Sequence, residues 1–389
     1  MTMTSRQRAV KALNHEEPDR VPKDMGSMNN STIHIDAYMN LLKYLGIKES
    51  DIEEPVLERL QQIVLNPDEK VTKILGVDFT PLYGAAPDKA PNEWDKGNIF
   101  SDEWGIVWEK RKGGFYYDPI PSMAPLKDID TIEGIRKYRW PDPDDEGRYR
   151  GIREKAKQLY NETDYAIVGS AMISIICWPW YLRGLETGLM DMVAKREYTD
   201  ELVELNTNVW LKIAINFLKE CGEYLDVLVV YQDDYDGQFC PIISPDIWSN
   251  MVVPRMENAS RKLKEYTKAK IFCHACGSVS ARINDMAAAG IDILNPVQVA
   301  AKSMGDTRML KEEFGNKMTF WGGIDTQRVL NLGSVEDVRK EVKTRIRDLA
   351  PGGGYVVAAV HNIQRDVPPQ NVVALFEAVE EYGKYPIKL

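Results

Sequence analysis

Cysteine is scarce in this chain of 389 residues: there are five, an odd number, and they are scattered. A disulfide framework needs paired cysteines and an oxidising compartment, so we expect buried thiols, metal ligands or catalytic groups instead. Histidine is scarcer still, with four residues. A chain of this length buries a large core, which removes the need for covalent cross-links.

Long apolar runs and an excess of positive charge are also missing. No stretch of about 18 consecutive apolar residues is present, so the sequence predicts no membrane-spanning helix. The segment 1–20 lacks the apolar centre of a signal peptide, and we expect a cytoplasmic location. The net charge of −10 argues against nucleic acid and against an anionic membrane surface as partners.

From residue 164 onward, short apolar segments such as "LDVLVVYQDD" and "AKIFCHACG" alternate with amphipathic ones. Ser244 followed by Pro245 is typical of the start of an intervening helix. Such alternation predicts βαβ units around a parallel sheet, either open and doubly wound or closed. The first strand lacks a following Gly-x-Gly-x-x-Gly, and polar residues follow several strands. Both observations favour a (β/α)8 TIM barrel of the α/β class.

Two earlier segments depart from this alternation. The amphipathic patterns of residues 1–70, which include 36–65, predict an N-terminal helical extension. In 95–118, aromatic and polar residues alternate around a Lys-Gly-Gly turn, which predicts a β-hairpin insertion. The run "ILGVDF" at 74–79 predicts a short buried strand. Because no linker separates these parts, we expect one barrel domain over 1–389.

The stretch "KIFCHACGS" at 270–278 is the main candidate for chemistry. Side chains alternate along a strand, so Phe272, His274 and Cys276 share one face at the carboxyl end of this strand. In the last strand, "YVVAAVHN", His361 takes the corresponding position. Two imidazole nitrogens and one thiolate suit a catalytic zinc ion, which keeps one coordination position open. The alternative is ordinary packing, since free cysteine is among the most buried residue types.

Acidic and aromatic residues follow other predicted strands, where a TIM barrel carries its catalytic groups. We predict catalytic roles for Asp78 and for one of the adjacent Asp233 and Asp234, which point to opposite faces. A helix N-cap or a solvated loop carboxylate is the simpler role for each aspartate. The predicted substrate contacts are Trp321, Asp325 and Tyr235.

Several further motifs span the chain: "HEEPDRVP", "LGVDF", "HACGSV", "GIDILNPVQ", "FWGGIDTQ" and "GGGYVVAAVHNIQRDVPPQ". Together they resemble the uroporphyrinogen decarboxylase superfamily, and the resemblance covers nearly the whole chain. It implies a (β/α)8 barrel with an open cleft at the carboxyl ends of the strands. It also implies one of two activities. One is cofactor-free decarboxylation of a tetrapyrrole. The other is zinc-dependent methyl transfer to or from a corrinoid, as in methylcobamide:coenzyme M methyltransferases and O-demethylase methyltransferases.

The two branches imply different residues. The decarboxylase binds a substrate with eight carboxylates through an arginine-rich N-terminal clamp, but no arginine lies between Arg20 and Arg59 here. The methyltransferase branch has a His-x-Cys zinc motif, which His274 and Cys276 match, and a third ligand near the C-terminus. In this chain that position carries His361 in place of cysteine. A nearby carboxylate is the alternative third ligand.

The resemblance therefore implies a zinc-dependent methyltransferase that moves a methyl group between a small donor and the corrinoid (cobalamin) of a partner protein. The expected donor is a methoxylated aromatic compound, methanol or a similar molecule, and Asp234 or Asp233 would protonate the leaving oxygen. A zinc ion with fewer thiolates suits such an oxygen ligand. The alternatives are a metal-independent decarboxylase of a porphyrinogen or smaller acid and a non-catalytic barrel that docks a partner. The oligomeric state stays open, with a homodimer as one candidate.

Overall fold

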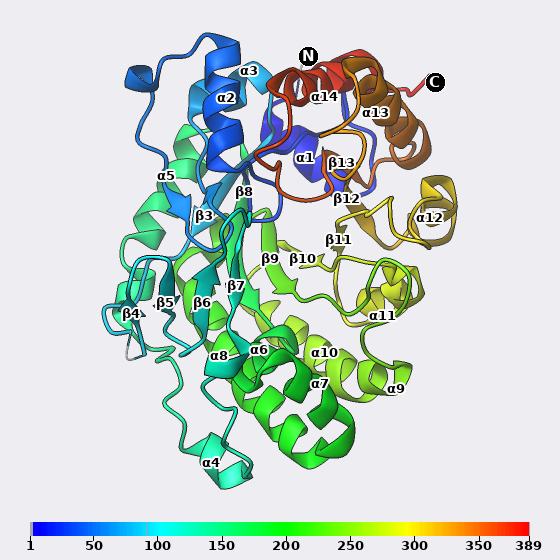
Figure 1. Ribbon diagram of the computed structural model, residues 1–389. Helices are drawn as coiled ribbons and strands as arrows, with labels where there is room; N and C mark the ends of the chain where they lie inside the picture. The colour runs from blue at the N-terminus through cyan, green and yellow to red at the C-terminus, as the bar shows by residue number, and fades with distance from the viewer. Residues whose placement is uncertain (1–2, 91, 389) are drawn as a thin grey trace.

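Parallel strands surrounded by helices form a barrel in the computed structural model, which describes residues 3–90 and 92–388 (Figure 1). The predicted domain bounds at residues 1 and 389 lie outside the described residues. Seven strands pair in parallel, in the order β13, β12, β11, β10, β9, β8 and β3. Their bounds are Phe79–Tyr83 for β3, Ala166–Ile173 for β8, Val227–Gln232 for β9, Lys270–His274 for β10, Ile293–Asn295 for β11, Thr319–Ile324 for β12 and Tyr355–Ala359 for β13.

The eighth strand is the short segment 21–24, which bridges the two edges of this sheet. Its Lys23 pairs in parallel with Val357 of β13. On the other side, the carbonyl oxygen of Lys23 accepts a hydrogen bond of 2.9 Å from the backbone N–H of Asp78, just before β3. The predicted (β/α)8 barrel is therefore confirmed.

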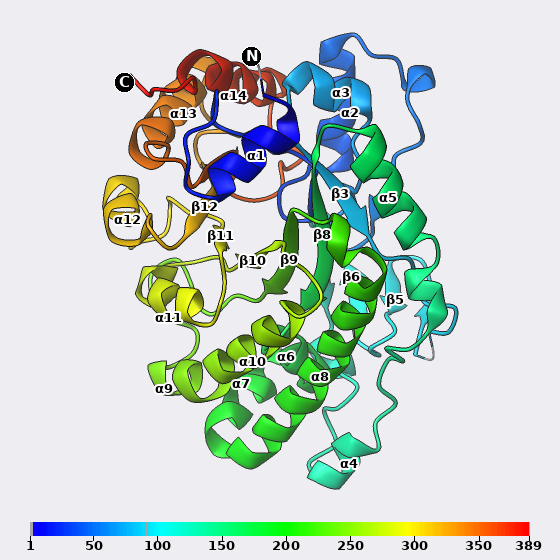
Figure 2. The same cartoon turned by 180° about the vertical axis from the view of Figure 1, so that it is seen from behind.

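Helices cover the outside of the barrel and return the chain to the amino end of each following strand (Figures 1 and 2). Ser244 caps the helical segment after β9 by accepting a hydrogen bond of 3.2 Å from the N–H of Ile247, as its position before Pro245 predicts. The bounds are Ile152–Glu162 for α5, Cys177–Arg183 for α6, Leu185–Ala194 for α7, Arg196–Cys221 for α8, Pro245–Ile247 for α9, Val253–Leu263 for α10, Ile283–Ala288 for α11, Thr307–Phe314 for α12, Val335–Leu349 for α13 and Pro369–Tyr382 for α14.

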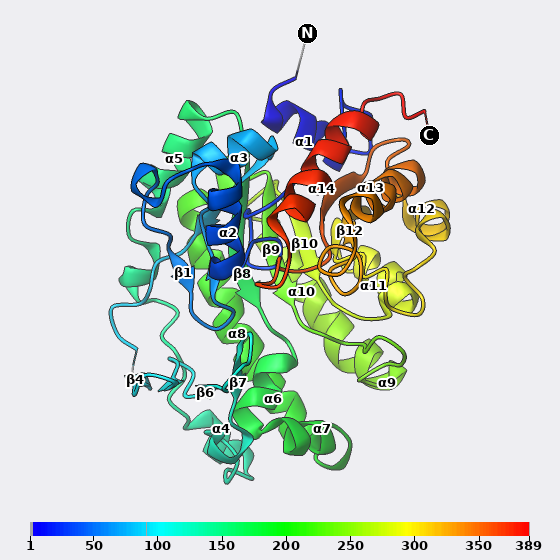
Figure 3. The same cartoon turned by 45° about the horizontal axis from the view of Figure 1, so that its top comes forward.

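The amino end of the barrel is closed by α1 (Ser5–Leu13). Thr4 and Gln7 form a capping box that starts this helix. Ala9 and Leu13 pack against the apolar residues that fill the barrel interior, Trp321 among them. Figure 3 shows α1 and α14 at the same end of the barrel. The opposite end, where the strands finish, is left for chemistry.

The N-terminal extension is less helical than predicted. Helix α2 covers only Ile35–Leu45, and the rest of 36–65 holds a single 3₁₀ turn and the short strands β1 (Leu57–Glu58) and β2 (Ile63–Val64). Proline disfavours helical geometry in the residue before it, and Pro55 interrupts this stretch.

The strand predicted at 74–79 is also wrong. Glu69–Leu75 forms α3, which ends at Gly76 with a φ of +67°. The strand begins only at Phe79. The apolar run crosses a helix end, a tight turn and a strand start, and an apolar run alone does not distinguish these.

The insertion is a four-stranded antiparallel sheet, which is larger than the predicted hairpin. The Lys-Gly-Gly turn does join two paired strands, β6 (Val107–Lys110) and β7 (Tyr117–Pro119). The sheet is extended by β5 (Ile99–Ser101) and β4 (Trp94–Asp95), and the short helix α4 (Ile132–Arg136) follows.

Among the described residues, no helix is long and apolar enough to cross a membrane.

Candidate metal centre

His274, Cys276 and His361 meet at the carboxyl end of the barrel. His274 is the last residue of β10, and His361 lies two residues after the end of β13. One ligand atom from each of the three lies within 4.8 Å of the others, and Cys276 Sγ is 3.5 Å from His274 Nε2. The two imidazole centroids are 5.3 Å apart. The structure thus brings together three side chains that are up to 87 residues apart, since 361 − 274 = 87.

Asn295 fixes the orientation of the His274 ring. The Asn295 amide nitrogen donates to the carbonyl oxygen of Trp321 at 3.0 Å, so its oxygen is the atom that faces His274 Nδ1 at 2.5 Å. An amide oxygen only accepts, and Nδ1 must therefore carry the proton. The lone pair of the ring is left on Nε2, which points toward Cys276. This is the arrangement in which imidazoles bind metal ions, with the second nitrogen held by a hydrogen bond.

Both imidazoles are neutral at physiological pH. Burial lowers the pKa of His274 to about 4, opposed by its hydrogen bond to Asn295. Burial, together with the neighbouring His274, lowers the pKa of His361 to about 4 as well. Burial raises the pKa of the Cys276 thiol, and the nearby Asp234 adds to this effect. Two neutral imidazoles and a sulfur within this short span fit a zinc ion, which would favour the thiolate form of Cys276.

The metal-free protein should lose stability as the pH falls from 7 toward 4. An unfolded histidine has a pKa of about 6.5, so between that value and about 4 the unfolded state binds more protons at each of these two sites. Each site then contributes a slope of about 1.4 kcal/mol per pH unit near pH 5. Urea unfolding of chelator-treated protein at several pH values would measure the slope. His361→Gln should make it shallower, and an unchanged slope would contradict the assignment.

Of the two adjacent aspartates, Asp234 faces the three ligand residues. Its Oδ1 accepts a hydrogen bond of 3.0 Å from the backbone N–H of Cys276. The surrounding protein raises its pKa, while the backbone hydrogen bond and His361 act in the opposite direction. Asp233 points to the other side and is buried, where it accepts hydrogen bonds from Ser174 and from the backbone at the start of α6. Asp233 is thus a helix cap, the simpler role weighed from the sequence.

The three residues predicted to contact the substrate instead contact other residues of the protein. Tyr235 is fully buried, with its ring 5.0 Å from that of Trp248. Asp325 accepts hydrogen bonds from the backbone of Gln327 and Arg328 in the turn after β12. Trp321 fills the barrel interior, with its ring centroid 4.4 Å from that of Phe79 and the two rings tilted by 47°. We therefore propose structural roles for all three.

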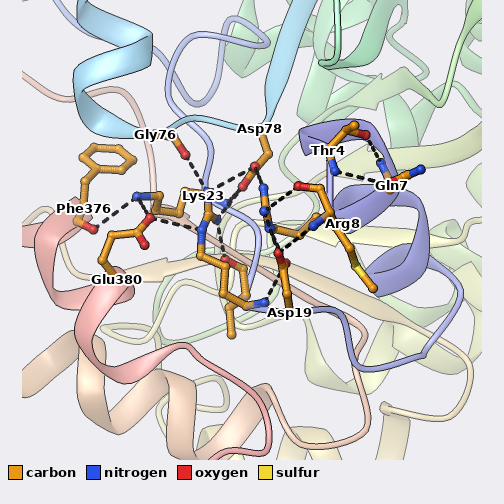
Figure 4. A network of polar contacts seen from close by, with 12 residues as sticks. Thr4, Gln7, Arg8, Asp19, Lys23, Gly76, Asp78, Phe376 and Glu380 are labelled. Atoms are coloured by element: carbon orange, nitrogen blue, oxygen red, sulfur yellow. Dashed lines mark hydrogen bonds and ion pairs between the residues drawn. The ribbon is translucent and has the colours of Figure 1, made fainter. Parts of the chain in front are cut away.

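Asp78 lies at the amino end of the barrel, opposite to the three ligand residues. It precedes β3 and is fully buried. Its carboxylate binds Arg8 and Arg20 at 2.7 Å each and the backbone N–H of Lys23 at 2.9 Å (Figure 4). Lys23 in turn binds Glu380 of α14 at 2.6 Å. Because no strand is formed at 74–78, Asp78 precedes a strand and does not follow one, as had been expected. Its contacts place Asp78 in a structural ion-pair network.

Two buried polar residues at the barrel strands had not been singled out from the sequence. Asn295 ends the strand in "GIDILNPVQ", so its position after an apolar run was a usable signal. Asp24 is the last residue of the short eighth strand and accepts a hydrogen bond of 3.1 Å from Trp321 Nε1. Burial raises the pKa of Asp24 to about 6. The segment "VPKD" is too short to show a strand pattern, which explains why Asp24 was missed.

The comparison with protein families gives a clear assignment. The family described as "Uroporphyrinogen decarboxylase (URO-D)" matches residues 116–382, well over half of the chain. The chain belongs to the URO-D family. This URO-D chain is 22% identical over 287 residues to a uroporphyrinogen decarboxylase of Pseudoalteromonas atlantica, which covers 72% of this chain and 74% of that protein.

Other relatives of this URO-D protein are methyltransferases by name. It is 25% identical over 191 residues to "Methylcobamide:CoM methyltransferase MtaA" of Methanosarcina barkeri, which covers 49% of this chain and 51% of that protein. The match thus spans about half the length of that relative. A solved structure of a methyltransferase from Methanosarcina mazei superposes with a TM-score of 0.63 at 17% identity, over 98% of this chain and 99% of that one. This likeness supports the fold.

Proposed function

We propose that this URO-D protein is a zinc-dependent methyltransferase that moves a methyl group between a small donor and the corrinoid of a partner protein. The observation that carries the proposal is the convergence of His274, Cys276 and His361. The similarity to the methyltransferase of Methanosarcina barkeri supports this branch of the family. Zinc in such a site acts as a Lewis acid toward a bound oxygen or sulfur.

The residues of the chain would prepare and protonate the bound donor. Asn295 holds His274 with Nε2 directed at the site. We propose His361 as the third ligand in preference to a carboxylate, because the cluster of ligand atoms within 4.8 Å of one another contains His361 and not Asp234. Asp234 is exposed on the open side of the site, and the surrounding protein raises its pKa above that of an ordinary aspartate. It would supply a proton to the oxygen that leaves the methyl group.

Aromatic residues beside the site support a methoxylated aromatic donor. Tyr116, from the turn before β7, accepts a hydrogen bond of 2.6 Å from Gln364, three residues after His361. Burial and nearby acidic groups, Asp234 among them, raise the pKa of Tyr181 of α6. The ring centroid of Tyr181 lies 5.7 Å from that of Trp178. By contrast, the segment 21–58 contains no arginine for the carboxylates of a porphyrinogen.

The test of the function compares two reactions on the same preparation. We expect about one zinc ion per chain, and demethylation of a methoxylated aromatic compound only when reduced cobalamin or a corrinoid protein accepts the methyl group. Chelation should abolish this reaction, and added zinc should restore it. Metal-independent release of carbon dioxide from a porphyrinogen would instead support decarboxylation. Neither zinc nor turnover would support a non-catalytic barrel.

Replacing Asn295 with alanine should weaken zinc binding. The variant removes the hydrogen bond that fixes the tautomer and orientation of His274. Loss of such a partner typically reduces metal affinity by about 10- to 100-fold. Competition with a chromophoric chelator would measure the affinity. Asn250, on the surface π-helical turn after α9, offers a control, since Asn250→Ala should leave the affinity unchanged. Equal affinity in wild type and Asn295→Ala would refute the role of Asn295.

A further inference from the structure

A cavity lies in the side wall of the barrel, and none of its lining residues belongs to the metal centre. Its volume is about 560 Å³, within the range of small-molecule binding sites. It lies between α3, β3 and α5, which Figure 2 shows on the same side of the molecule. Its floor is apolar and is formed mainly by Met25, Leu65, Phe79, Pro81, Ile152 and Leu159. Apolar side chains of this kind hold the ring of a ligand.

The strand arrangement explains why the wall is hollow at this place. The backbone hydrogen bond from Asp78 to Lys23 joins the segment 21–24 to the residue before β3, and β3 is the edge of the seven-stranded sheet. Pro81, in the middle of β3, has no N–H to offer a neighbouring strand. At Gly26 the chain turns away with a φ of +95° and packs closely against Pro67. The first two strands therefore separate, and the cavity occupies the space between them.

Charged groups lie at the exposed rim of this apolar floor. At the exposed rim, Lys155 of α5 forms no ion pair with any described residue, whereas Arg150 is paired with Asp88 and Glu69 with Lys73. The rim therefore carries one unbalanced positive charge in a protein whose net charge is −10. Tyr83 also lines the cavity, but its hydroxyl is buried away from the cavity space.

We infer that this cavity binds a small aromatic carboxylate. The ring would lie on the apolar floor, and the carboxylate would meet Lys155 at the rim. Many of the lining residues lie in the range 25–85, outside the part of the chain that matches the URO-D family. The site is independent of the proposed methyl transfer, because it uses no residue of the metal centre.

The test uses 2-naphthoate as the probe, titrated calorimetrically into the full-length protein. We expect saturable binding at one site per chain. Thr72→Trp fills the cavity from the half-buried face of α3 and should abolish binding. Lys155→Glu, at an exposed position, should weaken binding of 2-naphthoate by about tenfold and leave that of the uncharged methyl ester unchanged. Lys157→Glu, two residues along the same helix and outside the cavity, is the matched control.

His361→Ala separates this proposal from the proposed function. Binding of 2-naphthoate should persist in this variant, although zinc would be lost. A crystal soaked with 6-bromo-2-naphthoate should show the bromine between α3 and α5. The inference is overturned if wild type shows no saturable binding, if Lys157→Glu weakens binding as much as Lys155→Glu, or if His361→Ala removes binding while folded Thr72→Trp retains it.

Discussion

Replacing Cys276 with alanine should reduce bound zinc from about one ion per chain to near zero and remove methyl transfer with it. Cys276 supplies the sulfur of the three-residue cluster, and its Sγ lies 3.5 Å from His274 Nε2. Two imidazoles alone cannot complete a tetrahedral zinc site that keeps one open position. The loss should therefore exceed the roughly 10- to 100-fold weakening that removal of an outer hydrogen bond produces. Elemental analysis after dialysis gives the measurement.

The variant is expected to fold, because alanine keeps the backbone N–H that Asp234 binds. Cys240 provides the matched control, since it is an exposed cysteine in the loop after β9. Cys240→Ala should retain full zinc content and activity. Retention of stoichiometric zinc by Cys276→Ala would remove the basis of the proposed function while leaving the barrel intact.

Replacing Asp78 with asparagine should destabilise the protein strongly without affecting the metal centre. Asp78 is fully buried, and its charge balances Arg8 and Arg20, whose side chains are about one tenth exposed. Removing one partner of a buried charge network leaves the other charges uncompensated, which typically costs about 3–5 kcal/mol. The same carboxylate holds the backbone of Lys23, so closure of the barrel at its first strand is weakened as well. The midpoint and slope of urea unfolding would measure the loss.

Asp128, an exposed aspartate, is the control for this substitution. Asp128→Asn should change the free energy of unfolding by less than about 0.5 kcal/mol. The fraction of Asp78→Asn that stays folded should bind zinc as wild type does. A destabilisation below about 1 kcal/mol, or loss of activity in a stable variant, would point back to a catalytic role for Asp78.

Only part of the candidate site can be predicted from local sequence patterns. The two-residue spacing of His274 and Cys276 at a strand end is a local property, because alternation along a strand places both on one face. The position of Asn295 beside His274 depends on the register of β10 with β11, in which His274 pairs with Asn295. The roles of Asp233 and Asp234 likewise depend on which neighbours surround each carboxylate. A short stretch of sequence specifies neither the register between two strands nor the residues that surround a side chain in the folded protein.

By itself, the sequence determined the strand–helix alternation, the parallel pairing of the strands, and the shared face of His274 and Cys276, since each follows from periodicity along a few residues. Only the tertiary structure decided that His361 completes the cluster, that the segment 21–24 serves as the eighth strand, and that Asp78 lies at the end opposite to the site. These depend on contacts between residues far apart in the chain, and such contacts exist only once the barrel closes.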